Sequence, residues 1–435
     1  MTAQPEICIL NGENSQKGRR VWDGRGTKSN MERNYPIFTV SERAENSIRL
    51  GHPWVYDSEI LSGEGENGCL ATVGNRRGKW LGTAFYNGHS KIRLRLLSRN
   101  ANDDFSESFF ERRLRYAVDY RRTVMGPDFR CCRLIFGEAD SFPGLTVDRF
   151  ENVLVAQTLS LGMEKLKPML FRLLVKILCE SGETIDAVYE RNDVRIRELE
   201  GMEQNKGFLA LDGLHTDLPG VTEICENGIR YEVDYVNGQK TGFFLDQKYN
   251  RQAAARLAPG RRVLDCFTHT GAFALNAARA GAAHVCAVDV SAAALETAQK
   301  NAALNGLTDS ISFREANVFD FLTEMADHRD RSFDYIILDP PAFTKSHGSV
   351  HGAERGYREI NRRAMQLLPR GGYLATCSCS HFMTEELFCK MLHHAAADAD
   401  RSLRQIEARQ QSPDHPILWN VPETNYLKFY LFQVV

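Results

Sequence analysis

The fold is decided by the stretch Val263-Leu-Asp-Cys-Phe-Thr-His-Thr-Gly-Ala-Phe273, read together with Val285-Cys-Ala-Val-Asp289. The first is an apolar run that breaks at a Thr/Gly turn and continues into an Ala/Leu-rich helix. The second is another apolar run, and it ends in a carboxylate. Strand, tight turn, helix and strand in this order are typical of an open parallel sheet, where ligands bind beyond the carboxyl ends of the strands. We therefore expect a nucleotide-like ligand at this turn, with Asp289 accepting hydrogen bonds from ribose hydroxyls.

Two nucleotide-like ligands compete for this turn. A dinucleotide requires the pattern G-x-G-x-x-G, so that its pyrophosphate reaches the helix N-terminus. Residues 266–273 contain one glycine, Gly271. S-adenosylmethionine has no phosphate and needs one close approach of the backbone rather than three, so the turn favours S-adenosylmethionine. An ordinary strand-to-helix turn without a ligand is the structural alternative.

The chain from about residue 259 onward alternates strictly between strands and helices. This alternation predicts a doubly wound α/β sheet, a Rossmann-like domain. The expected strands lie near 262–266, 284–289, 311–315, 333–338, 371–377 and 426–434, and the expected helices near 272–280, 291–304, 318–328, 355–368 and 384–397.

The region from 37 to 97 contains short strand-like runs separated by Gly-rich turns, which predicts a small β-barrel. In its last strand, alternation places Lys91, Arg93 and Arg95 on one face. This face is either a stripe that contacts RNA phosphates or a solvated strand surface. The expected strands are 37–40, 52–56, 69–73, 80–85 and 92–97.

A helix is expected over 105–125, with Arg112 and Arg113 on a basic side. It leads into an α+β block with strands near 132–136, 145–150, 153–158, 187–190 and 207–210, a helix over 163–180 and a hairpin at 222–226 and 229–235. We divide the chain into a flexible tail (1–35), the barrel (36–104), the linker helix with the central α+β domain and hairpin (105–237) and the Rossmann-like domain (238–435).

Composition limits the function classes. The formal net charge of -2 over 435 residues gives no global basic field, so any nucleic-acid surface must be a local patch. The 11 cysteines show no CxxC pair and no zinc-type spacing, which indicates a reduced, cytoplasmic protein without a metal site. We also expect neither a signal peptide nor a membrane span.

The strand at 333–338 is broken sharply by Asp339-Pro340-Pro341. Two prolines fix φ and cannot continue a ladder of hydrogen bonds, so they hold a carboxylate and carbonyl groups rigidly at the strand tip. A nucleobase held flat beside the cofactor turn can hydrogen-bond to these acceptors.

The next strand ends in Thr376-Cys-Ser-Cys-Ser-His381. A thiolate here can attack C6 of a pyrimidine, which makes C5 nucleophilic toward a sulfonium methyl group. Cys377 and Cys379 are both candidates; we expect Cys377 within the strand as a buried small side chain, and Cys379 beyond it, facing the pocket. Asn317 follows the third strand and either reads the adenine edge or caps the next helix.

With these motifs in order, the sequence resembles the bacterial class I S-adenosylmethionine-dependent methyltransferases that make 5-methylcytidine in 23S ribosomal RNA, the methyltransferase I group. The resemblance covers about residue 37 to the end. It is carried by His52-Pro-Trp-Val-Tyr56, Gly137-Glu-Ala-Asp-Ser-Phe-Pro-Gly-Leu-Thr-Val-Asp-Arg149, Lys240-Thr-Gly-Phe-Phe-Leu-Asp-Gln247, Asp265-Cys-Phe-Thr-His-Thr-Gly-Ala-Phe273, Asp339-Pro-Pro-Ala-Phe343, Ser378-Cys-Ser380 and Asp414-His-Pro416.

The resemblance implies a PUA-type RNA-binding barrel, a central α+β domain and a Rossmann-like catalytic domain. It implies Cys379 as the nucleophile, and Asn317 stands where the family usually has Asp. A homodimer stays open, because PUA barrels also support dimers. The expected cofactor-binding residues are Phe244, Asp246, Gln247, Asp265, Phe267, Thr268, Gly271, Asp289, Val290, Asn317, Val318, Asp339 and Pro340.

The sequence thus leads to the hypothesis of an RNA cytosine-C5 methyltransferase acting on 23S ribosomal RNA or a large-subunit particle. In this hypothesis Cys379 attacks C6 and Asp339 holds the base. RNA is gripped by the barrel and the basic helix, through Lys91, Arg93, Arg95, Arg112 and Arg113. The rivals are a guanine-N7 methyltransferase, which needs no cysteine at 379, a non-catalytic RNA-binding assembly factor, and a nicotinamide dehydrogenase, which the missing glycines disfavour.

Overall fold

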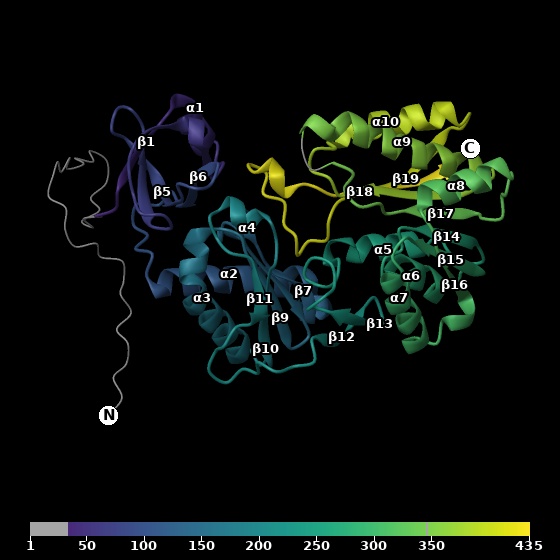
Figure 1. Cartoon of the computed structure of the whole chain (residues 1–435), viewed down its shortest axis with the longest axis horizontal. Helices are drawn as coiled ribbons and strands as arrows, with labels where there is room; N and C mark the ends of the chain where they lie inside the picture. Colours follow the sequence, from purple (N-terminus) through teal and green to yellow (C-terminus); the bar gives the residue numbers. More distant parts are fainter. Residues whose placement is uncertain (1–33, 345–346) are drawn as a thin grey trace. The chain divides into compact units, whose positions relative to one another are not determined.

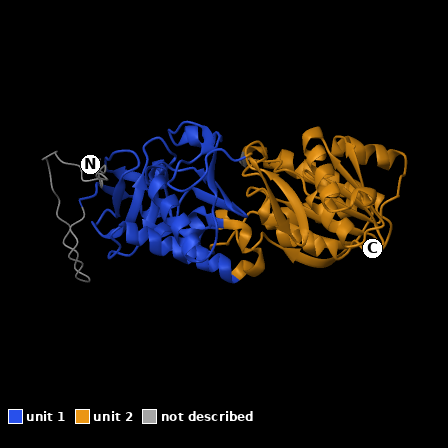
Figure 2. Cartoon of the chain, turned by 90° about the horizontal axis from the view of Figure 1, so that it is seen from below, with its two compact units in different colours: residues 1–123, 134–218, 419–421 blue, residues 124–133, 219–418, 422–435 orange. Residues whose placement is uncertain are grey.

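The computed structural model describes residues 34–344 and 347–435. Apart from its last two residues, the expected flexible tail at 1–35 lies outside the described residues. The chain forms two compact units (Figure 2). Unit 1 holds the described chain up to Thr123, together with Leu134–Leu218 and Trp419–Val421; unit 2 holds Val124–Arg133, Pro219–Leu418 and Pro422–Val435.

The first part of unit 1 is a six-stranded sheet with strand order β2-β6-β5-β4-β1-β3 (Figure 1). The five expected strands are present, and α1 and β3 are additional. Helix α1 begins after Ser41, whose hydroxyl accepts from the N–H of Ala44 at 3.3 Å, a contact typical of a helix start. The elements are β1 (Ile37–Val40), α1 (Glu42–Arg49), β2 (Trp54–Tyr56), β3 (Ile60–Ser62), β4 (Leu70–Gly74), β5 (Trp80–Tyr86) and β6 (Ile92–Ser98).

The rest of unit 1 is built on a five-stranded sheet with order β11-β10-β9-β8-β7. Strands β8 and β9 form an antiparallel hairpin, and β9 and β10 run parallel. The expected basic helix is present as α2, and its apolar side, with Phe109, Phe110 and Leu114, is buried. The elements are α2 (Glu107–Met125), β7 (Cys131–Phe136), β8 (Leu145–Phe150), β9 (Val153–Thr158), α3 (Leu161–Glu180), β10 (Ala187–Asn192), α4 (Ile196–Leu199) and β11 (Asn205–Phe208).

The hairpin of β12 (Val221–Glu226) and β13 (Ile229–Asp234) lies in unit 2, not with the central α+β domain to which the sequence assigned it. Its backbone is tied to the end of α7 (Ala292–Leu304). Asn305 Oδ1 accepts from the N–H of Arg230 at 2.9 Å, and Asn301 Oδ1 accepts from the N–H of Glu232 at 2.9 Å. The pairing of strand edge and helix end is non-local, so local sequence patterns did not reveal it.

The main sheet of unit 2 has seven strands in the order β16-β15-β14-β17-β18-β20-β19. The first five are parallel, β20 is antiparallel to β18, and β19 is antiparallel to β20, so the expected doubly wound sheet is confirmed. Helices α5, α6 and α7 lie on one face and α8, α9 and α10 on the other (Figure 1). The elements are α5 (Lys248–Ala255), β14 (Arg262–Cys266), α6 (Ala272–Arg279), β15 (His284–Asp289), β16 (Ile311–Glu315), α8 (Val318–Asp327), β17 (Tyr335–Leu338), α9 (Val350–Leu367), β18 (Tyr373–Ser378), α10 (Glu385–Asp398), β19 (Leu403–Arg409) and β20 (Lys428–Val434).

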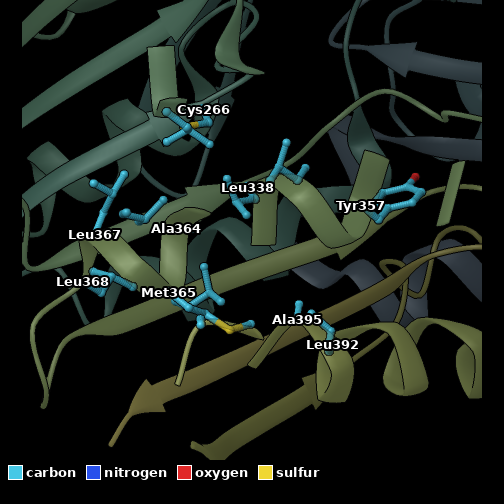
Figure 3. Close-up of a cluster of buried hydrophobic side chains, with 14 of the residues drawn as sticks. Cys266, Leu338, Tyr357, Ala364, Met365, Leu367, Leu368, Leu392 and Ala395 are labelled. Carbon is cyan, nitrogen blue, oxygen red and sulfur yellow. The ribbon is translucent and has the colours of Figure 1, made fainter. Parts of the chain in front are cut away.

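A buried cluster joins the sheet to α8, α9 and α10 (Figure 3). Cys266 and Leu338 enter it from β14 and β17, and Tyr357, Met365 and Leu392 enter it from the helices. Each is nearly inaccessible to solvent, so the cluster fixes the carboxyl ends of the central strands. Within residues 34–344 and 347–435, every helix is too short or too polar to span a lipid bilayer.

Candidate active site

The turn after β14 is braced from within by Asp265. Its Oδ2 accepts from Thr268 Oγ1 at 2.5 Å and from the N–H of Ala274 at 2.9 Å, while its buried Oδ1 has no hydrogen-bond partner. Burial raises the pKa of Asp265 to about 7. At Gly271 the backbone has φ +83°, and a Cβ there would lie 2.9 Å from Leu275 Cδ1. The turn therefore needs glycine at this position.

Asp289 ends β15 beside the same turn. Its Oδ2 accepts from the N–H of His269 and its Oδ1 from the N–H of Ser291, both at 2.9 Å. His269 and Phe267 have φ of 51° and 63°, in the left-handed region that is costly for side chains of their size. Two such residues shortly before Gly271 are the kind of backbone strain that clusters at ligand sites.

The remaining residues expected at the cofactor differ in their surroundings. Asn317 caps α8, because its Oδ1 accepts from the N–H of Phe319 at 2.9 Å, and Val318 is buried behind it. Val290 is 70% exposed. The capping alternative for Asn317 is thus present in the structure.

At the end of β17, Asp339 is tied to two neighbours. Cys377 Sγ donates to Asp339 Oδ1 at 2.9 Å, and Gln247 Nε2 donates to the same oxygen at 3.0 Å. Burial raises the pKa of Asp339, and both hydrogen bonds oppose that rise. Cys377 lies within β18 and is buried, as expected, but its thiol makes a polar contact that the reading as a small apolar side chain missed.

Cys379 is the first residue after β18, and it is half-buried. The serines on either side fix its turn: Ser378 Oγ donates to Tyr357 Oη at 3.0 Å, and Ser380 Oγ donates to the carbonyl of Thr344 at 3.0 Å. Burial raises the pKa of the Cys379 thiol to about 11, although the charges of two lysines act in the opposite direction.

The loop before α5 brings its expected residues to the same place. The ring of Phe244 lies 5.2 Å from the ring of His269 in the cofactor turn. Lys240 Nζ lies 4.5 Å from the centroid of the Phe244 ring. Asp246 is buried, and its Oδ2 accepts from Tyr426 Oη at 2.7 Å. Burial opposes ionisation of Asp246, but the charges of Lys240, His415 and Arg133, together with the Tyr426 hydrogen bond, lower its pKa.

The structure therefore brings the loop, the cofactor turn and Asp339 together at the carboxyl edge of the sheet, with Cys379 directly after β18. Sequence reasoning missed Tyr426 and Lys428, which come from the last turn and strand of the chain. Lys428 Nζ donates to the carbonyl of Ser380 at 2.6 Å. A lysine opening an apolar strand was the one available signal.

The five expected RNA-binding residues divide by exposure. Arg95 is buried, and its guanidinium pairs with Glu138 and Glu200 at 3.3 and 2.8 Å. Arg113 donates to the carbonyl of Leu97 at 2.7 Å and has a side chain 17% exposed. Lys91 is exposed, Arg112 is half-exposed, and Arg93 is partly exposed beside Asp57.

Comparison with known proteins gives two family matches. A family model described as S-adenosylmethionine-dependent methyltransferase matches residues 180–433, and one described as PUA-like domain matches residues 38–99.

Curated relatives match most of the chain. A protein of Shewanella denitrificans is 42% identical over 88% of this chain and 96% of its own length, and one of Erwinia tasmaniensis is 40% identical over 91% and 98%. Both are named ribosomal RNA large subunit methyltransferase I.

Solved structures share the fold. A putative S-adenosylmethionine-dependent methyltransferase from Streptococcus mutans superposes with a TM-score of 0.77 at 21% identity, covering 91% of this chain and 99% of that one. A putative methyltransferase crystallised with SAH gives 0.78 at 21% identity, with the same coverage.

Proposed function

The chain belongs to the S-adenosylmethionine-dependent methyltransferases named ribosomal RNA large subunit methyltransferase I, and from this premise we propose that it makes 5-methylcytidine in 23S ribosomal RNA through a covalent bond to Cys379. The observation that carries the proposal is the position of Cys379. It stands half-buried directly after β18, and β18 pairs in parallel with β17, the strand that Asp339 follows.

The residues at the turn fit S-adenosylmethionine. Gly271 leaves room for a close approach, and each carboxylate oxygen of Asp289 accepts one backbone N–H, which leaves lone pairs for ribose hydroxyls. Asp265 keeps a buried oxygen without a partner. When bound, the cofactor supplies an electrophilic methyl group.

The protein's own residues supply the nucleophilic half of the reaction. The Cys379 thiolate forms a bond to C6 of cytosine, which opens the C5–C6 double bond and makes C5 the nucleophile. After methylation, loss of the C5 proton restores the double bond, and the sulfur leaves as thiolate. Asp339, held by Cys377 and Gln247, positions the base as a hydrogen-bond partner.

We propose that RNA contacts unit 1 through the cations that reach solvent in α2, in β6 and directly before β6. Lys91, Arg93 and Arg112 reach solvent, whereas Arg95 and Arg113 are occupied within the unit. The substrate is 23S ribosomal RNA, free or in a large-subunit particle.

The deciding experiment is methyl transfer to 23S RNA, and to large-subunit particles, from cells that lack the enzyme, followed by mass spectrometry of the digested nucleosides. We expect 5-methylcytidine with the wild type and with Cys389→Ala, a matched change at an exposed cysteine. We expect none with Cys379→Ala. A methylated guanosine as the product, or full activity of Cys379→Ala, would overturn the proposal.

A further inference from the structure

Lys428 is a buried cation fixed next to Cys379. It opens β20 opposite Ser378 in the register of β18, and the residue is 6% exposed. Nζ donates to the carbonyl of Ser380 at 2.6 Å and to the carbonyl of Tyr426 at 2.8 Å. One hydrogen bond thus ties the amine to Ser380, the residue after Cys379, and the other ties it to Tyr426, two residues before Lys428.

The environment of Lys428 contains few anions. The titratable groups that act on Lys428 are Cys377 in β18, Cys379 directly after β18 and Glu385 in α10. Glu385 already accepts from Tyr430 Oη at 2.7 Å. In the described part of the chain, no carboxylate forms an ion pair with Lys428. Burial lowers the pKa of Lys428 to about 8. A buried ammonium held by carbonyl groups alone is costly, and a nearby anion offsets that cost.

The Cys379 thiol needs a cation nearby to ionise. Its burial disfavours the thiolate, which is the form that attacks carbon. The charges of Lys240 and Lys428 favour the thiolate, and those of Asp339 and Asp246 disfavour it. Lys240 is 52% exposed and lies 4.0 Å from Asp246 Oδ2, so solvent and a carboxylate weaken its influence. Lys428 is the shielded cation of the two, and its charge acts through a medium of lower dielectric constant.

We propose that Lys428 is a positioning residue for the methyl transfer, which fixes the Cys379 turn and stabilises the Cys379 thiolate with its ammonium group. This inference rests on the proposed function, in which Cys379 is the nucleophile. Ionisation releases the thiol proton to solvent, and the resulting thiolate and the ammonium of Lys428 form an ion pair.

The test follows alkylation of Cys379 by iodoacetamide against pH, read on the peptide that contains Cys379 by mass spectrometry. Lys428→Met removes the charge and keeps the stem; each unit by which the thiol pKa rises lowers the thiolate fraction about tenfold. We expect alkylation at pH 7.5 and the methyl-transfer kcat to fall about tenfold, with KM for RNA unchanged. Lys300→Met, at a 66% exposed lysine of α7, should change neither rate.

Lys428→Arg keeps the inference testable if Lys428→Met does not fold. Arginine stays charged where Lys428 begins to lose its proton, so alkylation of Cys379 at pH 9 should be at least as fast as in the wild type. Slower alkylation in Lys428→Arg, or an unchanged profile in a folded Lys428→Met, would overturn the inference. If the alkylation profile shifts but the product is not 5-methylcytidine, the proposed function fails and the effect of Lys428 on the thiol stands.

Discussion

The thiol of Cys377 lies 2.9 Å from Oδ1 of Asp339, so the residue next to the end of β18 holds the carboxylate that follows β17. Gln247 Nε2 reaches the same oxygen at 3.0 Å. The two cysteines of this strand end therefore have separate surroundings: Cys377 supports a carboxylate inside the sheet, and Cys379 stands beyond the sheet edge.

Cys377→Val removes one donor from Asp339 and is expected to raise the pKa of its carboxyl further. Oδ1 of Asp339 then keeps one donor, Gln247 Nε2, so the carboxylate that positions the base is held less firmly and kcat should fall roughly tenfold. Cys377→Ser keeps a donor and should stay within a few-fold of the wild type. Steady-state methyl-transfer rates of the two variants test this expectation. Equal losses of kcat in both would show that packing of the sulfur matters rather than the hydrogen bond.

A covalent bond between Cys379 and C6 can be trapped with RNA transcribed with 5-fluorocytidine. Release of the enzyme requires loss of a proton from C5, and in this analogue fluorine replaces the hydrogen that would leave. In the presence of S-adenosylmethionine the wild type should form an RNA–protein complex that survives a denaturing gel. Cys379→Ala should form none, and Cys389→Ala should behave as the wild type. Absence of a complex with the wild type, under conditions that methylate unmodified RNA, would contradict the covalent route.

Asp265 should make stability fall as pH rises from about 4 to about 7. Its carboxyl has a pKa raised to about 7 by burial in the folded chain, so the folded state binds a proton that the unfolded state has released. The contribution of Asp265 to the free energy of unfolding is complete below the pKa that its carboxyl has in the unfolded chain. It is lost as pH rises through the pKa in the folded chain. Between pH 5 and pH 7.5 the loss should be about 2 kcal/mol larger in the wild type than in Asp265→Asn, which stays neutral. Urea unfolding followed by circular dichroism measures this difference. If the free energy of unfolding changes with pH in the same way in both proteins, Asp265 is not the cause of the loss of stability.

Gly271→Ala should weaken S-adenosylmethionine binding at least tenfold. The new Cβ would have φ +83° and would meet Leu275 Cδ1 at 2.9 Å and Ala298 Cβ at 3.0 Å, so the turn must shift. Gly281→Ala is the matched control, because its φ is +93° but nothing lies within 4 Å of the added Cβ. Calorimetric titration should show affinity retained in the control; equal losses would mean that backbone strain, and not crowding at the turn, is responsible.

Lys91→Ala should weaken RNA binding and make its dependence on salt shallower by about one unit, as expected when one phosphate contact is lost. Lys176→Ala provides the control, since Lys176 is 51% exposed but pairs with Glu111 on α2. Filter binding over a range of salt concentrations gives, for each variant, the slope of log affinity against log salt concentration. An unchanged slope for Lys91→Ala would place the RNA contact elsewhere.

The sequence predicted the strands and helices of the doubly wound sheet closely, because their apolar runs are continuous and Gly or Pro residues end them. It missed β19, whose residues Leu403–Arg409 alternate weakly and carry charge, as suits an edge strand. It placed Arg95 on a free face because alternation cannot show that Glu138 and Glu200, far along the chain, cover that residue. Lys428 was missed for the same reason: only the pairing of β18 with β20 brings it to Cys379.

The repeated passage of the chain between the two units affects how the protein can be dissected and synthesised. Cutting at the 218/219 boundary would deprive the C-terminal fragment of Val124–Arg133, whose Cys131 carbonyl accepts from the buried amine of Lys248 at 2.7 Å. That fragment would carry an orphaned lysine in its interior, so we expect it to aggregate unless the ten-residue segment is supplied as a peptide. During translation, too, Val124–Arg133 leaves the ribosome long before α5 and Asp414, which it contacts. Unit 2 cannot complete its folding until β20 has also been made.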